Sequence, residues 1–151
     1  MDSQGSIEIE APIELVFDIS TNHIPEWSTV VVEDEVIDET PEMVGSTFRS
    51  VTEDRGRRME FAGLVTRHEP PTASSVILTG EHFDIEVDVT LEDLGGRTRV
   101  TQHSTVRGKG FFKLLFFLMG WMMKKSSCDA LDKEHASLKA LCEARVAEAG
   151  A

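Results

Sequence analysis

Tyrosine is absent from this 151-residue sequence, and cysteine occurs only twice. Both cysteines, Cys128 and Cys142, fall in one stretch with helical character, where a continuous helix would hold them about 21 Å apart. A disulfide needs Cα atoms within about 7 Å of each other, so we expect two buried thiols, as in a reducing cytoplasm. The N-terminus lacks the basic start and apolar core of a signal peptide, which also indicates a cytoplasmic protein.

Clusters of basic residues are missing as well. The chain has 27 Asp and Glu residues against 15 Lys and Arg, which gives a net charge of −12. Nucleic acid and anionic membrane surfaces both repel such a domain, so we expect neither as a partner. The histidines at positions 23, 68, 82 and 103 have no second ligand at metal spacing. We therefore expect no metal site and no cofactor.

A hydrophobic run long enough to cross a bilayer is also lacking. The longest apolar run, residues 111–123, would span about 20 Å as a helix, whereas the hydrocarbon of a bilayer is about 30 Å thick. We therefore expect no stable membrane insertion. Lys124 and Lys125 follow this run directly and could still sit at a membrane surface, as interfacial anchors do.

The composition that is present indicates a folded domain. Hydrophobic residues make up 40% of the chain and charged residues 28%, which is typical of soluble globular proteins. A chain of this length can bury a core without disulfides or metal ions, so we expect a single domain over residues 1–151.

Hydrophobic periodicity predicts the order of the elements. Alternation predicts a short strand over residues 6–10, and Pro12 suits the first turn of a helix that places Ile13, Val16 and Phe17 on one face. A helical turn ending near Trp27 follows. Six further strands are then predicted, at residues 30–39, 45–52, 59–68, 76–79, 83–91 and 98–107.

Residues 111–147 predict one long helix, bent or interrupted near Gly120 or Ser126-Ser127, where helix propensity is weakest. From Cys128 onward the apolar residues recur at the spacing of an amphipathic helix. The first half is apolar on nearly every side, so it must be covered all round or touch something other than water. It could be a core helix, the wall of an apolar cavity, or a docking surface for a partner protein or for the second copy of a homodimer.

Together these elements predict an α+β fold in which a curved antiparallel sheet of about seven strands wraps around the C-terminal helix. Residues 83–91 alternate strictly, which indicates a strand with one apolar and one polar face. Only the long helix is large enough to cover that apolar face. A sheet curled around a helix often leaves a void, and a small ligand can bind there.

Several short motifs resemble one family across nearly the whole chain. They are Ile7-Glu8-Ile9-Glu10-Ala11-Pro12, Val16-Phe17-Asp18, Asn22, Pro25, Trp27, Val44-Gly45, Glu69-Pro70-Pro71, Gly96-Arg97-Thr98-Arg99-Val100-Thr101 and Leu138-Lys139. Together they resemble the START-like, Bet v 1-type (SRPBCC) superfamily, and within it the polyketide cyclase/dehydrase-like branch. The resemblance implies a helix-grip fold. That fold hosts carriers as well as cyclases, so the resemblance alone does not decide the function.

The alternation of side chains along each strand predicts which residues face the void. Val100 and Val106 share a face with Gln102 and Ser104 between them, so inward valines would also point this amide and this hydroxyl inward. If buried without hydrogen-bond partners, each of these groups would lower the stability of the fold by about 1–3 kcal/mol. They should therefore bond to each other, to water or to a ligand, unless the strand is partly exposed there. The full predicted ligand-binding set is Trp27, Met59, Phe61, Phe83, Ile85, Val87, Val100, Gln102, Ser104, Leu118, Trp121 and Met122.

His135 is the main candidate for catalysis, with Gln102 as a second polar group that could take part. His135 lies on the apolar stripe of the last helix, where it could be a core-edge histidine bonded to a strand carbonyl or an acid or base within the void. Enzymes of the superfamily place Arg, Tyr, His or Asp inside, and this chain has no Tyr and no predicted pair of inward titratable groups. We therefore predict binding or transport of a small hydrophobic molecule, such as a lipid, a fatty acyl chain or a polyketide-like ring. The alternative is a cyclase or dehydratase that uses His135.

Overall fold

The computed structural model describes residues 2–150, except for the side chains of residues 121, 123 and 124. Its elements follow the predicted order of one strand, two helices, six strands and one long helix. They are β1 (Asp2–Ile9), α1 (Ile13–Asn22), α2 (Ile24–Trp27), β2 (Val31–Asp38), β3 (Thr47–Asp54), β4 (Arg57–Glu69), β5 (Ala73–Thr79), β6 (Phe83–Asp93), β7 (Thr98–Gly108) and α3 (Phe111–Ala149).

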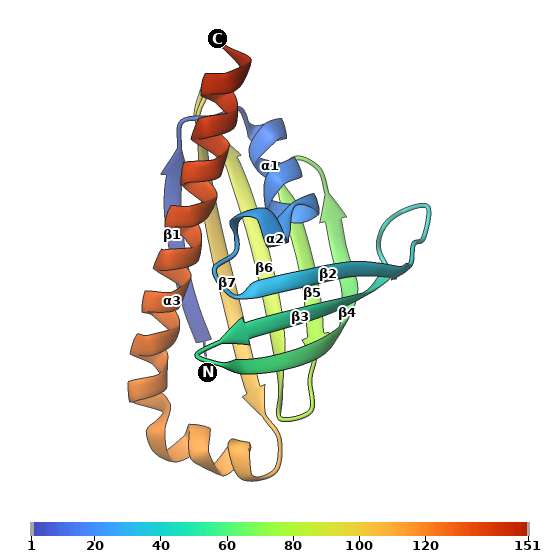
Figure 1. Ribbon diagram of the computed structural model, residues 1–151, viewed down its shortest axis with the longest axis vertical. Helices are drawn as coiled ribbons and strands as arrows, with labels where there is room; N and C mark the ends of the chain where they lie inside the picture. Colours follow the sequence, from blue (N-terminus) through green and yellow to red (C-terminus); the bar gives the residue numbers. More distant parts are fainter. Residues whose placement is uncertain (1, 151) are drawn as a thin grey trace.

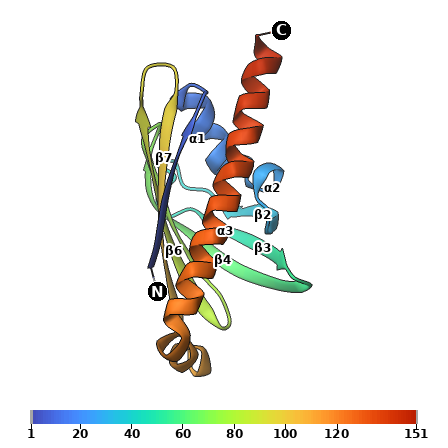
Figure 2. The same ribbon diagram turned by 90° about the vertical axis from the view of Figure 1, so that its left-hand side faces the viewer.

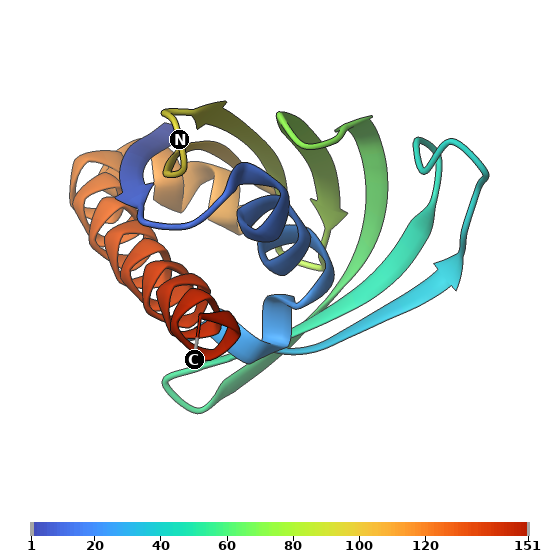
Figure 3. The same ribbon diagram turned by 90° about the horizontal axis from the view of Figure 1, so that it is seen from above.

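The strands form one seven-stranded sheet in the order β1-β7-β6-β5-β4-β3-β2, and all neighbours are antiparallel. The sheet curves so strongly that β2 and β3 run across the direction of the strands at the other end (Figure 1). Seen from above, α1, α2 and α3 lie on its concave side (Figure 3). The predicted α+β helix-grip fold is therefore confirmed.

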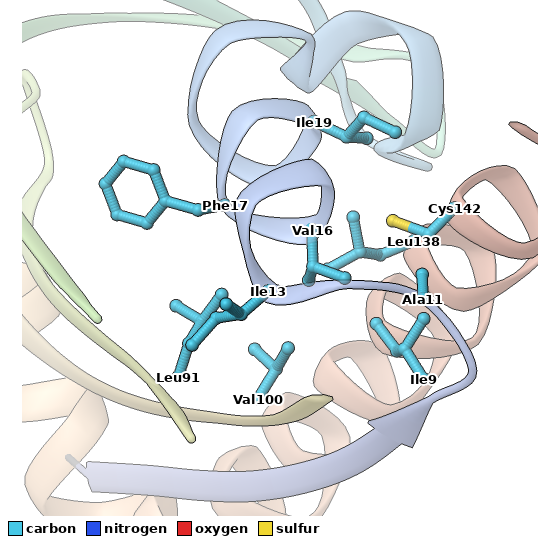
Figure 4. Packing of buried hydrophobic residues seen from close by; sticks show 10 residues of the cluster. All are labelled: Ile9, Ala11, Ile13, Val16, Phe17, Ile19, Leu91, Val100, Leu138 and Cys142. Atoms are coloured by element: carbon cyan, nitrogen blue, oxygen red, sulfur yellow. The ribbon is translucent and has the colours of Figure 1, made fainter. Parts of the chain in front are cut away.

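The core lies where α1 and the second half of α3 meet one end of the sheet. It is built from side chains that are each at most 2% exposed and that converge from β1, α1 and α3 (Figure 4), among them Ile9, Val16, Ile19, Leu138 and Cys142. The buried hydroxyl of Thr98 donates a hydrogen bond to the carbonyl oxygen of Ala11 at 2.8 Å. This bond ties the start of β7 to the loop before α1 without leaving a buried polar atom unpaired.

Both cysteines are free thiols. Burial raises the pKa of the Cys142 thiol to about 11, so it stays protonated and unreactive at neutral pH. Cys128 is only partly buried. The expectation of two buried thiols therefore holds fully for Cys142 alone.

The long helix is kinked at Met119, whose backbone angles of φ −117° and ψ 16° are not helical. This agrees with the bend predicted near Gly120. Residues 111–118, which we call the tip helix, lie across the lower end of the molecule, and the longer part of α3 runs up beside β1 (Figure 2). No helix in the described part of the chain combines the length and the apolarity needed to cross a membrane.

The unequal burial along α3 gives a stability prediction. Leu138→Ala leaves a hole in the core, because this side chain is 2% exposed, and we expect the free energy of unfolding to fall by about 2–5 kcal/mol. The matched control Leu118→Ala shortens a side chain that is 64% exposed, so it should change that free energy by less than about 0.5 kcal/mol. Urea denaturation followed by circular dichroism measures both, and equal losses would contradict this description of α3.

Candidate functional site

A cavity of about 350 Å³ lies between the concave face of the sheet and the helices α1 and α2, and its volume is in the range of small-molecule pockets. The apolar part of its wall comes from α2, the loop before β3 and five strands: Ile24, Trp27, Val31, Val36, Met43, Phe48, Val65, Val76, Leu78, Val87 and Val89. A larger groove of about 880 Å³ beside Phe116 and Phe117 is open to solvent. The more enclosed cavity is therefore the candidate site.

The register of β6 and β7 places the predicted polar pair on the face that bounds the cavity. Gln102 lies opposite Val89, and Ser104 lies opposite Val87. Residues directly opposite each other in a ladder share a face. The Gln102 side-chain nitrogen lies 3.1 Å from Ser104 Oγ and donates a hydrogen bond to it, so the two groups satisfy each other, which is one of the predicted alternatives.

Three of the predicted ligand-binding residues, Trp27, Val87 and Gln102, line the cavity. The indole nitrogen of Trp27 donates a hydrogen bond to the carbonyl oxygen of Ile19 at 3.0 Å. This bond fixes the ring in the wall between α1 and α2. Ligand binding by these three residues stays a prediction.

Six other predicted residues share the concave face but lie outside the cavity wall: Met59, Phe61, Phe83, Ile85, Val100 and Ser104. The ring centroids of Phe61 and Phe83 are 5.7 Å apart, and Phe83 also contacts Phe116 of the tip helix at 6.2 Å. Val100 belongs to the buried core. At Phe61, Phe83 and Val100, contacts with neighbouring side chains therefore occupy the concave face.

The structure corrects the placement of the predicted cavity residues from the last helix. Leu118 is 64% exposed and Met122 is 50% exposed, because the kink at Met119 turns this part of the chain away from the cavity. The side chain of Trp121 falls outside the described residues. Of the described side chains of α3, only Glu134 reaches the cavity wall.

Besides Glu134 of α3, sequence analysis missed two titratable residues that the sheet contributes to the cavity wall, Asp34 and His68. Each follows a register shift in its strand, between residues 31 and 33 in β2 and between residues 65 and 67 in β4. A β-bulge adds one residue and so reverses which side chains face inward. Strict alternation along either strand would have put both side chains on the outer face.

Asp34 is the cavity carboxylate that is available to a ligand. It has no hydrogen bond or ion pair with any described residue, whereas Glu134 accepts hydrogen bonds from Ser28 Oγ at 2.6 Å and from the backbone nitrogen of Thr29 at 2.5 Å. Solvent still reaches Asp34, but the cavity wall desolvates it in part. This desolvation raises the pKa of the Asp34 carboxyl above its ordinary value of 3.8.

The wall is acidic, because it contains Asp34 and Glu134 and, among the described residues, no Lys or Arg. Arg49 of β3 projects to the outer face, where its guanidinium pairs with Glu60 at 2.7 Å. A ligand carboxylate in the cavity would meet like charge and no cation, which is costly in a partly apolar site. The described residues also include no group of three or more His, Cys, Asp or Glu side chains that could hold a metal ion.

His135 is 2% exposed and lies outside the cavity wall. Neither of its ring nitrogens has a hydrogen-bond partner among the described residues, so the bond to a strand carbonyl, one of the predicted alternatives, is not formed. Burial lowers the pKa of the imidazole below its ordinary value of 6.5, which keeps the ring neutral at pH 7. Catalysis by His135 stays a prediction.

A family model described as "Polyketide cyclase / dehydrase and lipid transport" matches residues 2–143. A START superfamily protein from Mycobacterium smegmatis is 20% identical, with a TM-score of 0.81 over 94% of this chain and 97% of that chain. The Zhui aromatase/cyclase from Streptomyces sp. R1128 is 12% identical, with a TM-score of 0.74 over 97% and 95% of the two chains. The protein TTHA0849 from Thermus thermophilus is 15% identical, with a TM-score of 0.79 over 96% and 99%. No curated protein matches the sequence.

The burial of His135 predicts a pH dependence of stability. As the pH falls below about 6.5, the unfolded chain takes up a proton at this position before the folded protein does, so the free energy of unfolding should decrease. His135→Leu removes this titration and two unpaired buried nitrogens. We expect this variant to be at least as stable as the wild type at pH 7 and to lose less stability between pH 7 and pH 5. Parallel urea titrations at both pH values measure this, and equal acid-induced losses would contradict the assignment.

Proposed function

The chain belongs to the polyketide cyclase/dehydrase and lipid transport family, and from this premise we propose that it binds a small, uncharged and mainly apolar molecule in the cavity. The observation that carries the proposal is the cavity wall. Eleven apolar side chains line about 350 Å³ of space together with hydroxyl, amide and titratable groups, and among the described residues one carboxyl group of the wall, that of Asp34, is unpaired.

The apolar wall supplies the affinity. Removing apolar ligand surface from water contributes about 25 cal/mol for each Å² buried, and Val76, Val87 and Val89 offer an apolar surface of matching character. Much of this wall is sheet, so it is held by the ladders β5–β6 and β6–β7 and needs little reordering when a ligand enters. A rigid, ring-shaped ligand would suit such a preformed site.

The polar groups supply the orientation. The Asp34 carboxylate can accept a hydrogen bond from a ligand hydroxyl or amine, and Gln102 lies on another strand of the same wall. Of the ligand classes predicted from sequence, a neutral polyketide-like ring fits this wall better than a free fatty acid. The fatty-acid carboxylate would face Asp34 and Glu134 without a cation.

Two probes with the same ring system test the preference for a neutral ligand. In a Trp121→Phe variant, Trp27 is the only tryptophan, so its fluorescence reports on the occupancy of the cavity. We expect saturable binding of 1-aminoanthracene, which is neutral at pH 7, and binding at least about tenfold weaker of 1-anthracenecarboxylate. Equal or tighter binding of the carboxylate would contradict the role of the acidic wall, and no saturable response to either probe would contradict binding in this cavity.

A pair of phenylalanine variants on β6 tests the location. Val87→Phe fills the cavity, so 1-aminoanthracene should bind at least about tenfold more weakly. The control Thr90→Phe adds the same ring at an exposed position of the same strand and should leave affinity unchanged. Circular dichroism verifies that both variants are folded. If both variants bind like the wild type, the ligand does not sit against Val87.

A cyclase or dehydratase is the second candidate, and the raised pKa of Asp34 is the observation that favours it. A partly desolvated carboxyl group that keeps its proton to higher pH at the wall of a cavity is suited to act as a general acid. Asp34 lines the cavity and His135 does not, so Asp34 is the better candidate for this role.

Mass spectrometry of a linear polyketide after incubation with the protein separates the two functions. A carrier returns the molecule unchanged, whereas a dehydrating cyclase removes water from it. If wild-type protein removes water, we expect Asp34→Asn to lose at least about a hundredfold in rate, while 1-aminoanthracene binding weakens by less than about tenfold, because the apolar part of the wall supplies the affinity. Loss of turnover in His135→Ala with full turnover in Asp34→Asn would contradict this assignment.

A further inference from the structure

The tip helix and the residues after it carry a concentrated apolar surface. Among the side chains that the structure describes, eleven large hydrophobic ones are exposed, and six of these fall between residues 111 and 122. They are Phe111, Leu114, Phe117, Leu118, Met119 and Met122. Single exposed apolar residues are normal on protein surfaces, but a group of this size on one short segment marks an interaction site.

The tip helix has two different apolar faces. On the inner face, the ring of Phe112 contacts the ring of His82 at 4.8 Å, and Phe116 contacts Phe83 at 6.2 Å. On the outer face, Phe111, Leu114 and Leu118 follow one another at helical spacing, and Phe117 beside them is 85% exposed. The inner contacts fix the helix against the ends of the sheet, and the side chains of its outer face remain exposed to solvent.

The position of this face suits a flat partner. The tip helix forms the lower end of the molecule and lies across its long axis, with the rest of α3 rising away from it (Figure 1, Figure 2). The helix therefore forms one end of the molecule, although Lys113, Leu114 and Phe117 also line the open groove toward β1 and β7.

Basic residues are concentrated along the sequence of the same segment. Residues 107–125 contain five of the 15 Lys and Arg residues and none of the 27 Asp and Glu residues. Arg107 and Lys109 are paired at 2.9 Å with carboxylates of β6. Lys113 and Lys125 are exposed and have no ion pair among the described residues. The net charge of −12 describes the whole chain. At physiological salt, charges more than about 8–10 Å apart are largely screened, so the lysines nearest to an anionic surface determine how this region interacts with it.

We propose that the outer face of the tip helix docks the protein reversibly onto an anionic lipid bilayer. Lipid phosphates would meet Lys113 and Lys125, and the exposed rings and aliphatic side chains would enter the boundary between headgroups and acyl chains. A symmetric contact with a second copy would instead bring like-charged lysines together, and residues 107–125 include no acidic residue to balance them, although Asp2 of β1 lines the same groove as Lys113. The proposal is independent of what the cavity binds.

Vesicle co-sedimentation tests the proposal with the intact chain. We expect binding to vesicles of equal parts phosphatidylglycerol and phosphatidylcholine, weaker binding to pure phosphatidylcholine, and weakening as salt is added. F117S/L118S should bind at least about tenfold more weakly. The control I37S/L64S removes two exposed apolar side chains from the sheet and should bind like the wild type.

A second variant pair isolates the charge. Lys113→Glu should weaken binding to the anionic vesicles about tenfold, whereas Lys133→Glu, an exposed position in the second half of α3, should not weaken it. No binding of the wild type to the anionic vesicles, or equal binding by F117S/L118S, would overturn the proposal. A wild-type dimer in light scattering that F117S/L118S converts to a monomer would overturn it in favour of a second copy.

Discussion

Packing of the second half of α3 onto β1 determines how the rest of the sheet can be covered. Gly5 permits the close approach, because a Cβ atom at this position would lie only 3.1 Å from Cδ2 of Leu131. Beyond this contact, Leu138 and Cys142 fill the core against α1. One helix along one edge of a curved seven-stranded sheet cannot also cover the other edge. The short helices α1 and α2 span the remaining concave face, and the cavity is the space that they leave unfilled.

Where the strands pair without register shifts, much of this arrangement could be predicted from the alternation of side chains between the two faces of a strand. β6 and β7 pair without a register shift, so the alternation of residues 83–91 correctly placed Val87, and the spacing of Gln102 and Ser104 correctly placed both on the concave face. The long helix and its bend could also be predicted, because weak helix propensity near Gly120 is a local property of the sequence.

The acidic character of the cavity could not be predicted in this way. Asp34 belongs to an acidic run that is typical of a solvated strand, and a β-bulge turns it inward; His68 is turned inward by a second bulge. The extra residues at these bulges, Val32 and Thr66, are β-branched and fit a regular strand well, so no glycine or proline marks the change of parity. The two titratable groups that the sheet contributes to the cavity depend on non-local strand pairing, and the third, Glu134, comes from α3.

For the tip helix, too, the sequence pattern alone could not predict which side chains are buried. Its sequence is apolar on nearly all sides, so periodicity could not separate a buried face from an exposed one. The separation depends on the direction of the kink at Met119 and on the rings of His82 and Phe83, which lie far away in the sequence. As a result Leu118 and Met122, expected in the cavity, are on the surface.

A crystal structure of the protein grown with 1-aminoanthracene tests the central claim most directly. The account predicts the ring system between α1, α2 and the sheet, against Val87 and Val89, with its amine toward Asp34. A probe bound only in the groove beside Phe117, with the interior closed by side chains, would contradict it.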